Sequence, residues 1–172
     1  MPTCRAGRSN SQRGFTLAEL AIIVFIIALF AALTVPSLTG FGERDLSTAA
    51  RRLAGTIKYL YNEAALEGLT HRLVFDLDTS GYTAGRIEQN KELSALEGTG
   101  GGRELPGDVR FKDIYVNGRG SFSEGNVTIE IFPVGWIEEA VLHLIDGEEE
   151  LTLRIAPLTG TTEVYEGYRD FR

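Results

Sequence analysis

The stretch Arg13–Glu19 (Arg-Gly-Phe-Thr-Leu-Ala-Glu), with the apolar run that follows it to Val35, decides how this chain is organised. Phe15 to Val35 is 21 residues, enough for a helix to cross a bilayer core at about 1.5 Å per residue. One charge, Glu19, interrupts the run. A charge in such a segment costs about 2.5–3.5 kcal/mol, and less near its end, so it predicts a partner. If the chain were cut after Gly14, the new α-amino group would lie one helical turn away and could pair with Glu19, in the same chain or in a neighbour.

The residues before this stretch are basic and contain no acidic side chain: Arg5, Arg8 and Arg13. A basic leader, then Gly14–Leu20 (Gly-Phe-Thr-Leu-Ala-Glu-Leu), then an apolar helix resembles the type IV prepilin signature. The resemblance implies that a prepilin peptidase at the inner face of the membrane cuts between Gly14 and Phe15. It also implies that the same enzyme N-methylates Phe15, and that Glu19 aligns the subunit in a filament by meeting the N-terminus of its neighbour.

Two other interpretations of the N-terminal region remain open. A secretory signal also has a basic region followed by an apolar region. It leaves Glu19 unexplained, and no clean small-x-small cleavage site followed by a break is obvious after Val35. A plain signal anchor for an unrelated domain is the second alternative.

The composition of the chain limits the functions that the part after the leader can have. Cleavage after Gly14 would leave 158 of the 172 residues, and removal of the leader's three arginines would change the formal net charge from −7 to −10. Such an acidic chain is a poor candidate for binding nucleic acid through phosphate contacts. The basic leader, with no strong basic cluster after Val35, places the N-terminus in the cytoplasm and the domain outside. The only cysteine, Cys4, lies in the leader, so the mature chain would contain no disulfide.

Pro36 ends the apolar run. Proline inside a helix removes a backbone hydrogen bond, so Pro36, with Gly40 and Gly42, marks a soft point at which the helix could bend or melt. The alternative is that the helix stops here.

From Asp45 the pattern becomes that of an amphipathic helix, which Gly68 is placed to end. Its apolar residues recur at alternating spacings of four and three and predict a stripe packed on a sheet of the same chain. They are Leu46, Ala50, Leu53, Ile57, Leu60 and Ala64.

The remainder is typical of β-structure, with short alternating segments separated by Gly, Pro, Asp and Asn. The predicted strands are Arg72–Leu77, Tyr82–Ile87, Val109–Val116, Val127–Phe132, Ala140–Ile145, Leu151–Ile155 and Thr162–Tyr165. The first two form a predicted hairpin, as do the fifth and sixth. Residues 89–107 are predicted to form a loop that breaks the strand pattern. Its glycine cluster, Gly98–Gly102, is predicted to be flexible, with contact to a partner as the alternative. One long helix followed by six or seven short strands gives an α+β domain.

This order of elements, with Ile129–Gly135 (Ile-Glu-Ile-Phe-Pro-Val-Gly) and a closing hairpin ending in Pro157–Gly160, resembles the minor pseudopilins of the GspH/FimT type. The resemblance implies a spine helix packed on an antiparallel, β-sandwich-like head. Its parts would be a leader (1–14), a transmembrane and assembly helix (15–35), an amphipathic continuation (36–68) and a periplasmic head (69–172).

The function implied is that of a structural subunit in the pseudopilus of a type II secretion system. The protein would be a single-pass inner-membrane protein with a cytoplasmic N-terminus and a periplasmic head. Implied partners are the prepilin peptidase, other pseudopilins or pilins, an inner-membrane assembly platform and membrane lipid, with no nucleic acid. The alternative is a minor type IV pilin that helps to start assembly or sits at the tip, with a role in adhesion or DNA uptake.

No catalytic set, cofactor site or metal site is predicted. The two histidines, His71 and His143, stand far apart, and His143 is predicted to be satisfied within a strand or to lie at an edge. Glu148–Glu150 follows a turn and is predicted to be a solvated hairpin tip rather than a calcium site. For the alternative that binds DNA, the candidate patch is Arg103, Arg110, Lys112 and Arg119.

Overall fold

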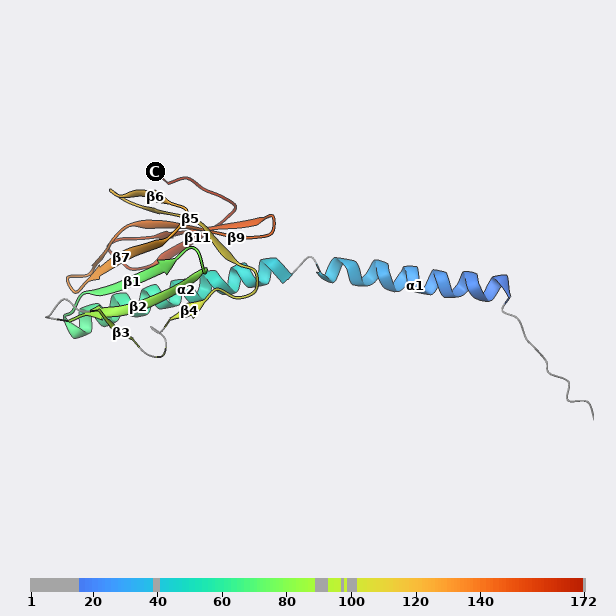
Figure 1. Cartoon of the computed structure of the whole chain (residues 1–172), viewed down its shortest axis with the longest axis horizontal. Coiled ribbons are helices and arrows are strands. Elements are labelled where there is room, and N and C mark those ends of the chain that lie inside the picture. Colours follow the sequence, from blue (N-terminus) through green and yellow to red (C-terminus); the bar gives the residue numbers. More distant parts are fainter. Residues whose placement is uncertain (1–15, 39–40, 89–92, 97, 99–101, 172) are drawn as a thin grey trace, which may run out of the picture. The chain divides into compact units, whose positions relative to one another are not determined.

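The computed structural model describes residues 16–38, 41–88, 93–96, 98 and 102–171, with residues 31–38 and 41–43 described by their helical backbone alone. The chain divides into two compact units, residues 1–39 and residues 40–172 (Figure 1). The first unit holds helix α1, and the second holds helix α2 and the strands.

Helix α1 (Leu17–Leu38) carries exposed side chains all the way from Leu17 to Phe30. The helix continues through Pro36 and ends at Leu38, two residues later. Gly40 lies outside the described residues, and the continuity of the spine is therefore not tested. No helix within the described part of the chain is both long enough and apolar enough to cross a membrane.

Helix α2 (Phe41–Glu67) confirms the predicted amphipathic helix and begins before Gly42, which lies inside it. The six residues of the predicted stripe are all buried, with exposed fractions of 0–3%. Gly68 ends the helix with a positive φ of 69°, and its N–H donates to the Ala64 carbonyl at 3.0 Å. Glycine tolerates this left-handed conformation without a steric cost, which is why the helix ends where the sequence predicts.

The strands of the second unit form two antiparallel sheets. The first has the order β3 (Leu93–Ala95), β2 (Gly81–Ile87), β1 (His71–Asp76), β7 (Asn126–Phe132) and β8 (Trp136–Ile137), and β4 (Arg103–Glu104) also pairs with β2. The second has the order β11 (Thr162–Glu166), β10 (Glu149–Ile155), β9 (Ala140–Asp146), β5 (Arg110–Val116) and β6 (Gly120–Phe122).

All seven predicted strands are present, as β1, β2, β5, β7, β9, β10 and β11, and both predicted hairpins form. The description of residues 89–107 as loop was incomplete, because β3 and β4 lie in this segment and pair with β2. Two further short strands, β6 and β8, were also not predicted. Strands of two or three residues are too short to show a period of two in the sequence.

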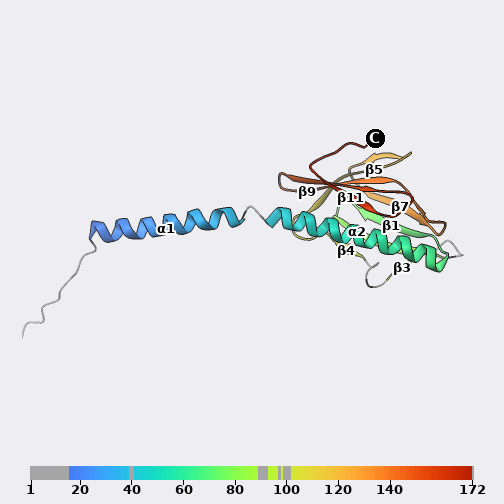
Figure 2. The same ribbon diagram turned by 180° about the vertical axis from the view of Figure 1, so that it is seen from behind.

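One hydrophobic core joins α2 to both sheets. Helix α2 packs against β1 and β7 of the first sheet and against β9, β10 and β11 of the second. The sheets meet where the rings of Phe75 and Phe111 contact edge to face, with centroids 5.5 Å apart. Both views show the chain end marked C on the side of the head away from α2 (Figures 1 and 2).

Candidate assembly site at the start of the first helix

Helix α1 begins with a reciprocal capping arrangement between Thr16 and Glu19. The Thr16 N–H and hydroxyl both donate to Glu19 Oε2, at 3.0 and 3.2 Å, and the Glu19 N–H donates to Thr16 Oγ1 at 3.2 Å. This is a capping box, in which an N-cap threonine and a glutamate three residues later satisfy each other's free backbone donors. The carboxylate also lies in the first turn, where the helix dipole favours negative charge.

The arrangement gives Glu19 a partner in Thr16, which the sequence-based prediction did not include. Thr16 is the functional residue that was missed. Its signal was present in the sequence as the Thr-x-x-Glu spacing just before an apolar run. Gly14 and Phe15 lie outside the described residues, so the expected cleavage, methylation and pairing with an N-terminus stay predictions.

Beyond the capping box, α1 presents an apolar surface on every side. Its large exposed side chains include Leu20 (60%), Phe25 (68%) and Phe30 (66%). A helix that is apolar all round needs cover from lipid or from other helices. The structure therefore combines one polar site with a long apolar surface in the first unit.

The four basic residues proposed as a DNA-binding patch are not all available for phosphates. Lys112 pairs with Glu150 at 2.5 Å, and this hydrogen bond raises the pKa of the Lys112 amine. Arg119 pairs with Glu138 at 3.1 Å and also donates to the Thr128 carbonyl. Glu150, expected to be a solvated hairpin residue, thus neutralises part of the patch.

Both histidines are buried in the head. His143 is satisfied, as predicted, since Nδ1 lies 2.7 Å from Asp113 Oδ1 and Nε2 lies 3.0 Å from the Arg169 carbonyl oxygen. Of the two predicted alternatives, a satisfied position or an edge position, the first holds, because its strand β9 is central in the second sheet. His71 lies in β1 with Nε2 3.5 Å from Glu67 of α2.

An exposed apolar cluster lies on two turns of the head. Val134 is 85% exposed, Leu158 73% and Trp136 40%. Tyr61 of α2 lies between the turns, with its hydroxyl 2.8 Å from the Gly135 carbonyl oxygen and 2.6 Å from that of Leu158. Trp136 is half-exposed and packs against Phe132, with ring centroids 5.2 Å apart.

The chain is similar to known proteins in a short N-terminal motif, in sequence and in fold. The prokaryotic N-terminal methylation motif matches residues 9–35. The type II secretion system protein H of Pseudomonas aeruginosa is 41% identical over 84 residues, 48% of this chain, and the chain spans about half (47%) of that relative's length. Fimbrial protein Q of Moraxella bovis is 29% identical over 121 residues, 70% of this chain and 68% of that protein.

Among solved structures, the minor pseudopilin EpsH from the type 2 secretion system of Vibrio cholerae matches with a TM-score of 0.60 at 16% identity. The match covers 73% of this chain and 99% of that chain. The motif match covers residues 9–35 alone, and at 16% identity the match to EpsH is one of fold. The chain is thus similar over 84 residues to a type II secretion system protein H, and it shares its fold with the minor pseudopilin EpsH.

Proposed function

We propose that the protein is a minor pseudopilin that acts as a structural subunit of a type II secretion pseudopilus and so helps to export folded proteins across the outer membrane. The observation that carries the proposal is the first unit itself, an exposed apolar helix whose one carboxylate, Glu19, sits in its first turn. The side chains described in this helix, from Leu17 to Phe30, are all exposed, which suits a segment that moves from lipid into a filament of like helices. No catalytic activity is proposed.

The proposal includes processing and topology. A prepilin peptidase would cut between Gly14 and Phe15 and methylate Phe15, and residues 15–35 would form the membrane segment. Support for a span comes from the length of the apolar run, which continues to Val35. The N-terminus would be cytoplasmic and the head periplasmic, with lipid, the assembly platform and other pseudopilins as partners.

The first test is the mass of the N-terminal peptide of the membrane-extracted protein, with and without the prepilin peptidase. The expected result is a methylated Phe15 N-terminus that is absent when the peptidase is deleted. An unprocessed start, or a cut after Val35, contradicts the proposal. Either result would leave an anchored or secreted β-rich domain.

The second test separates the two roles now available to Glu19. Glu19→Gln keeps a group that can complete the capping box but removes the charge that would pair with an ammonium group. Glu19→Ala removes both. If charge pairing drives assembly, both variants insert normally but give at least about tenfold less filament, since a lost charge-assisted bond is worth about 1.5–3 kcal/mol.

The matched control for these variants is Glu148→Gln, which removes one carboxylate from the exposed β9–β10 turn. It should leave filament yield and secretion unchanged. Normal assembly of Glu19→Gln with defective assembly of Glu19→Ala would assign the role to capping instead. Normal assembly of both Glu19 variants would show that Glu19 has no role in filament assembly.

A minor type IV pilin is the second candidate, and the 29% identity to fimbrial protein Q over 121 residues favours it. Deletion of the gene distinguishes the two. Loss of secretion of a folded exoprotein with normal surface pili supports the pseudopilin, and the reverse supports the pilin. For a DNA-binding pilin, reversal of the charges at Arg103, Arg110, Lys112 and Arg119 should abolish DNA uptake.

A further inference from the structure

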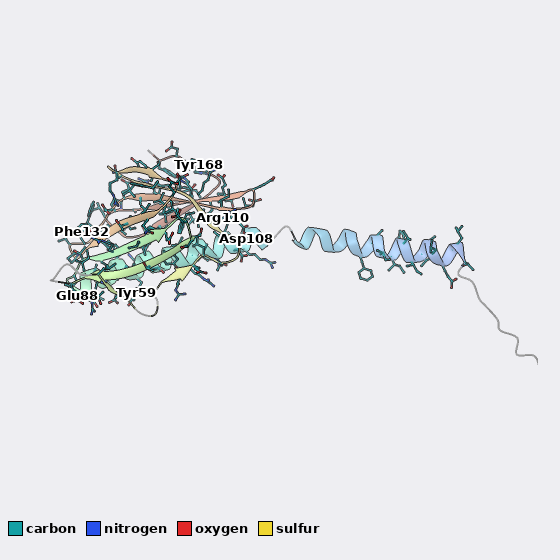
Figure 3. The ribbon with its side chains drawn as sticks, in the orientation of Figure 1. Tyr59, Glu88, Asp108, Arg110, Phe132 and Tyr168 are labelled. Atoms are coloured by element: carbon teal, nitrogen blue, oxygen red, sulfur yellow. The ribbon has the colours of Figure 1, made fainter. Side chains whose placement is uncertain are left out.

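Residues Gly167–Phe171, here called the strap, follow β11 and fold back over the outer face of the second sheet. Three backbone groups of the strap are held by buried side chains of the sheet. The Thr152 hydroxyl donates to the Gly167 carbonyl at 2.7 Å and accepts from the Arg169 N–H at 3.0 Å. The Arg169 carbonyl oxygen lies 3.0 Å from His143 Nε2. Figure 3 shows Tyr168 on the opposite side of the head from Tyr59 of α2.

The groups that hold the strap form a row across four neighbouring strands. Asp113 of β5 lies opposite His143 of β9, His143 lies opposite Thr152 of β10, and Thr152 lies opposite Tyr165 of β11. The first of these pairs depends on an irregularity in β5, because the register with β9 shifts between Phe111 and Asp113. A bulge of this kind re-aims a side chain, and here it sets the Asp113 carboxylate beside the imidazole.

The ring of His143 is enclosed on its open face by the strap. The Tyr168 ring stacks on the imidazole with centroids 3.9 Å apart and an interplanar angle of 16°. His143 is only 3% exposed. The imidazole therefore has no solvent contact of consequence while the strap is in place, and its hydrogen bonds must be completed by protein groups.

The two hydrogen bonds of His143 determine how many protons the His143–Asp113 pair must hold. Both partners of His143, the Asp113 carboxylate and the Arg169 carbonyl, are hydrogen-bond acceptors. A neutral imidazole has one N–H and can donate to only one of them, whereas an imidazolium donates to both. The alternative is a neutral ring with its hydrogen on Nε2 and a protonated Asp113. In either distribution the His143–Asp113 pair holds one proton more than a neutral histidine beside an ionised aspartate.

Five other ionisable side chains lie around the pair. They are Lys112 of β5, which lies over the Tyr168 ring, Glu150 of β10, Tyr165 of β11, and Tyr168 and Arg169 of the strap. Hydrogen bonds to Glu150 and Glu163 raise the pKa values of Lys112 and Tyr165 respectively. Glu150 offsets the charge of Lys112.

We propose that His143 and Asp113 form a one-proton latch that closes the strap over the second sheet when the pair is protonated and releases it as the pH rises. The inference concerns only the second unit and does not rest on the proposed function. Release would uncover the row Asp113–His143–Thr152 and the strand next to the strap, β11. The sign follows from linkage, because the closed state binds the extra proton and is favoured at lower pH. With one proton involved, the opening equilibrium changes by at most about tenfold per pH unit.

The test is amide hydrogen exchange of the full chain in detergent micelles, from about pH 5.5 to about 8.5, with rates corrected for their intrinsic pH dependence. The expected result is that protection of the Arg169 amide falls across this range, approaching tenfold per pH unit. The amides of α2 report in the same experiment that the head stays folded. Protection of Arg169 that does not change with pH would overturn the latch.

Two variants with opposite expectations make the test specific. His143→Ala removes both donors, so the strap should be open at every pH. In Asp113→Asn the side-chain amide can itself donate to a neutral imidazole, leaving the Nε2 hydrogen for the Arg169 carbonyl. That variant should keep the strap closed and lose the pH dependence. Glu148→Gln removes the same charge from an exposed turn and should behave as the parent chain does.

Nitrogen NMR of the two ¹⁵N-labelled histidine rings checks where the proton lies. At the lower pH, His143 should show either two protonated nitrogens or, if Asp113 holds the proton, one hydrogen on Nε2. A ring with its only hydrogen on Nδ1 would leave Nε2 unable to donate to Arg169 and would overturn the proposal. A pH dependence that persists in Asp113→Asn would overturn it equally.

Discussion

The two helices of this protein are consecutive and similar in length, 22 residues in α1 and 27 in α2, but they differ in how their apolar side chains are covered. Helix α2 places its apolar residues in one stripe, and that stripe is buried under two sheets. Helix α1 is apolar on all sides, and ten large apolar side chains from Leu17 to Phe30 are exposed. The comparison teaches that an amphipathic helix finds its cover within its own chain, whereas a uniformly apolar one depends on cover from outside.

The largest expected effect comes from shortening the same residue type in each helix. Leu53 of α2 is fully buried and Leu20 of α1 is 60% exposed. Leu53→Ala should lower the free energy of unfolding of the head by about 2–5 kcal/mol, because it removes packed methyl groups and leaves a cavity. Leu20→Ala should leave that free energy unchanged.

Denaturant unfolding of the full chain in detergent measures both variants, and Leu66→Ala serves as a control within α2 because Leu66 is 80% exposed. Equal losses at Leu53 and Leu66 would show that the buried stripe does not anchor the helix.

An intermediate effect is expected where α2 meets a turn of the second sheet. A Cβ at Gly160 would lie 2.4 Å from Cγ of Tyr61, whereas a Cβ at Gly147 would have no neighbour within 4 Å. The two glycines have nearly the same φ, 59° and 60°, so alanine strains the backbone equally at both. Gly160→Ala should therefore destabilise the head by about 1–3 kcal/mol more than Gly147→Ala, through overpacking against α2.

Thermal unfolding of this glycine pair provides the measurement. Equal shifts of the two midpoints would mean that Tyr61 moves aside without cost.

The smallest expected effect lies at the first turn of α1. Thr16→Val removes the hydroxyl that donates to Glu19 and accepts its N–H. Because Thr16 and Glu19 are exposed, the first turn should lose about 0.5–2 kcal/mol of local stability while unfolding of the head is unchanged. Hydrogen exchange of the Glu19 and Leu20 amides measures this loss, and Thr16→Ser, which keeps the hydroxyl, is the matched control. Equal protection in the two variants would argue against the capping box.

Much of the fold could be predicted from local pattern. The stripe from Leu46 to Ala64 marked the buried face of α2, Gly68 marked its end, and alternation marked the seven longer strands. The site was predicted in part, since Glu19 was singled out for its charge while its capping partner Thr16 was passed over. The cost of a charge in an apolar run predicts a group of opposite charge, whereas the capping box is a set of hydrogen bonds to a neutral hydroxyl and a backbone N–H.

The sequence by itself determined which faces are apolar, because periods of 3.6 and 2 residues are local properties that any short window shows. Only the tertiary structure decided which strands became neighbours, that β3 and β4 pair with β2, and that a shift in β5 sets Asp113 against His143, thirty residues away in the chain. Pairing of this kind is set by register across a sheet, and register depends on the packing of both sheets against α2 rather than on any single stretch of residues.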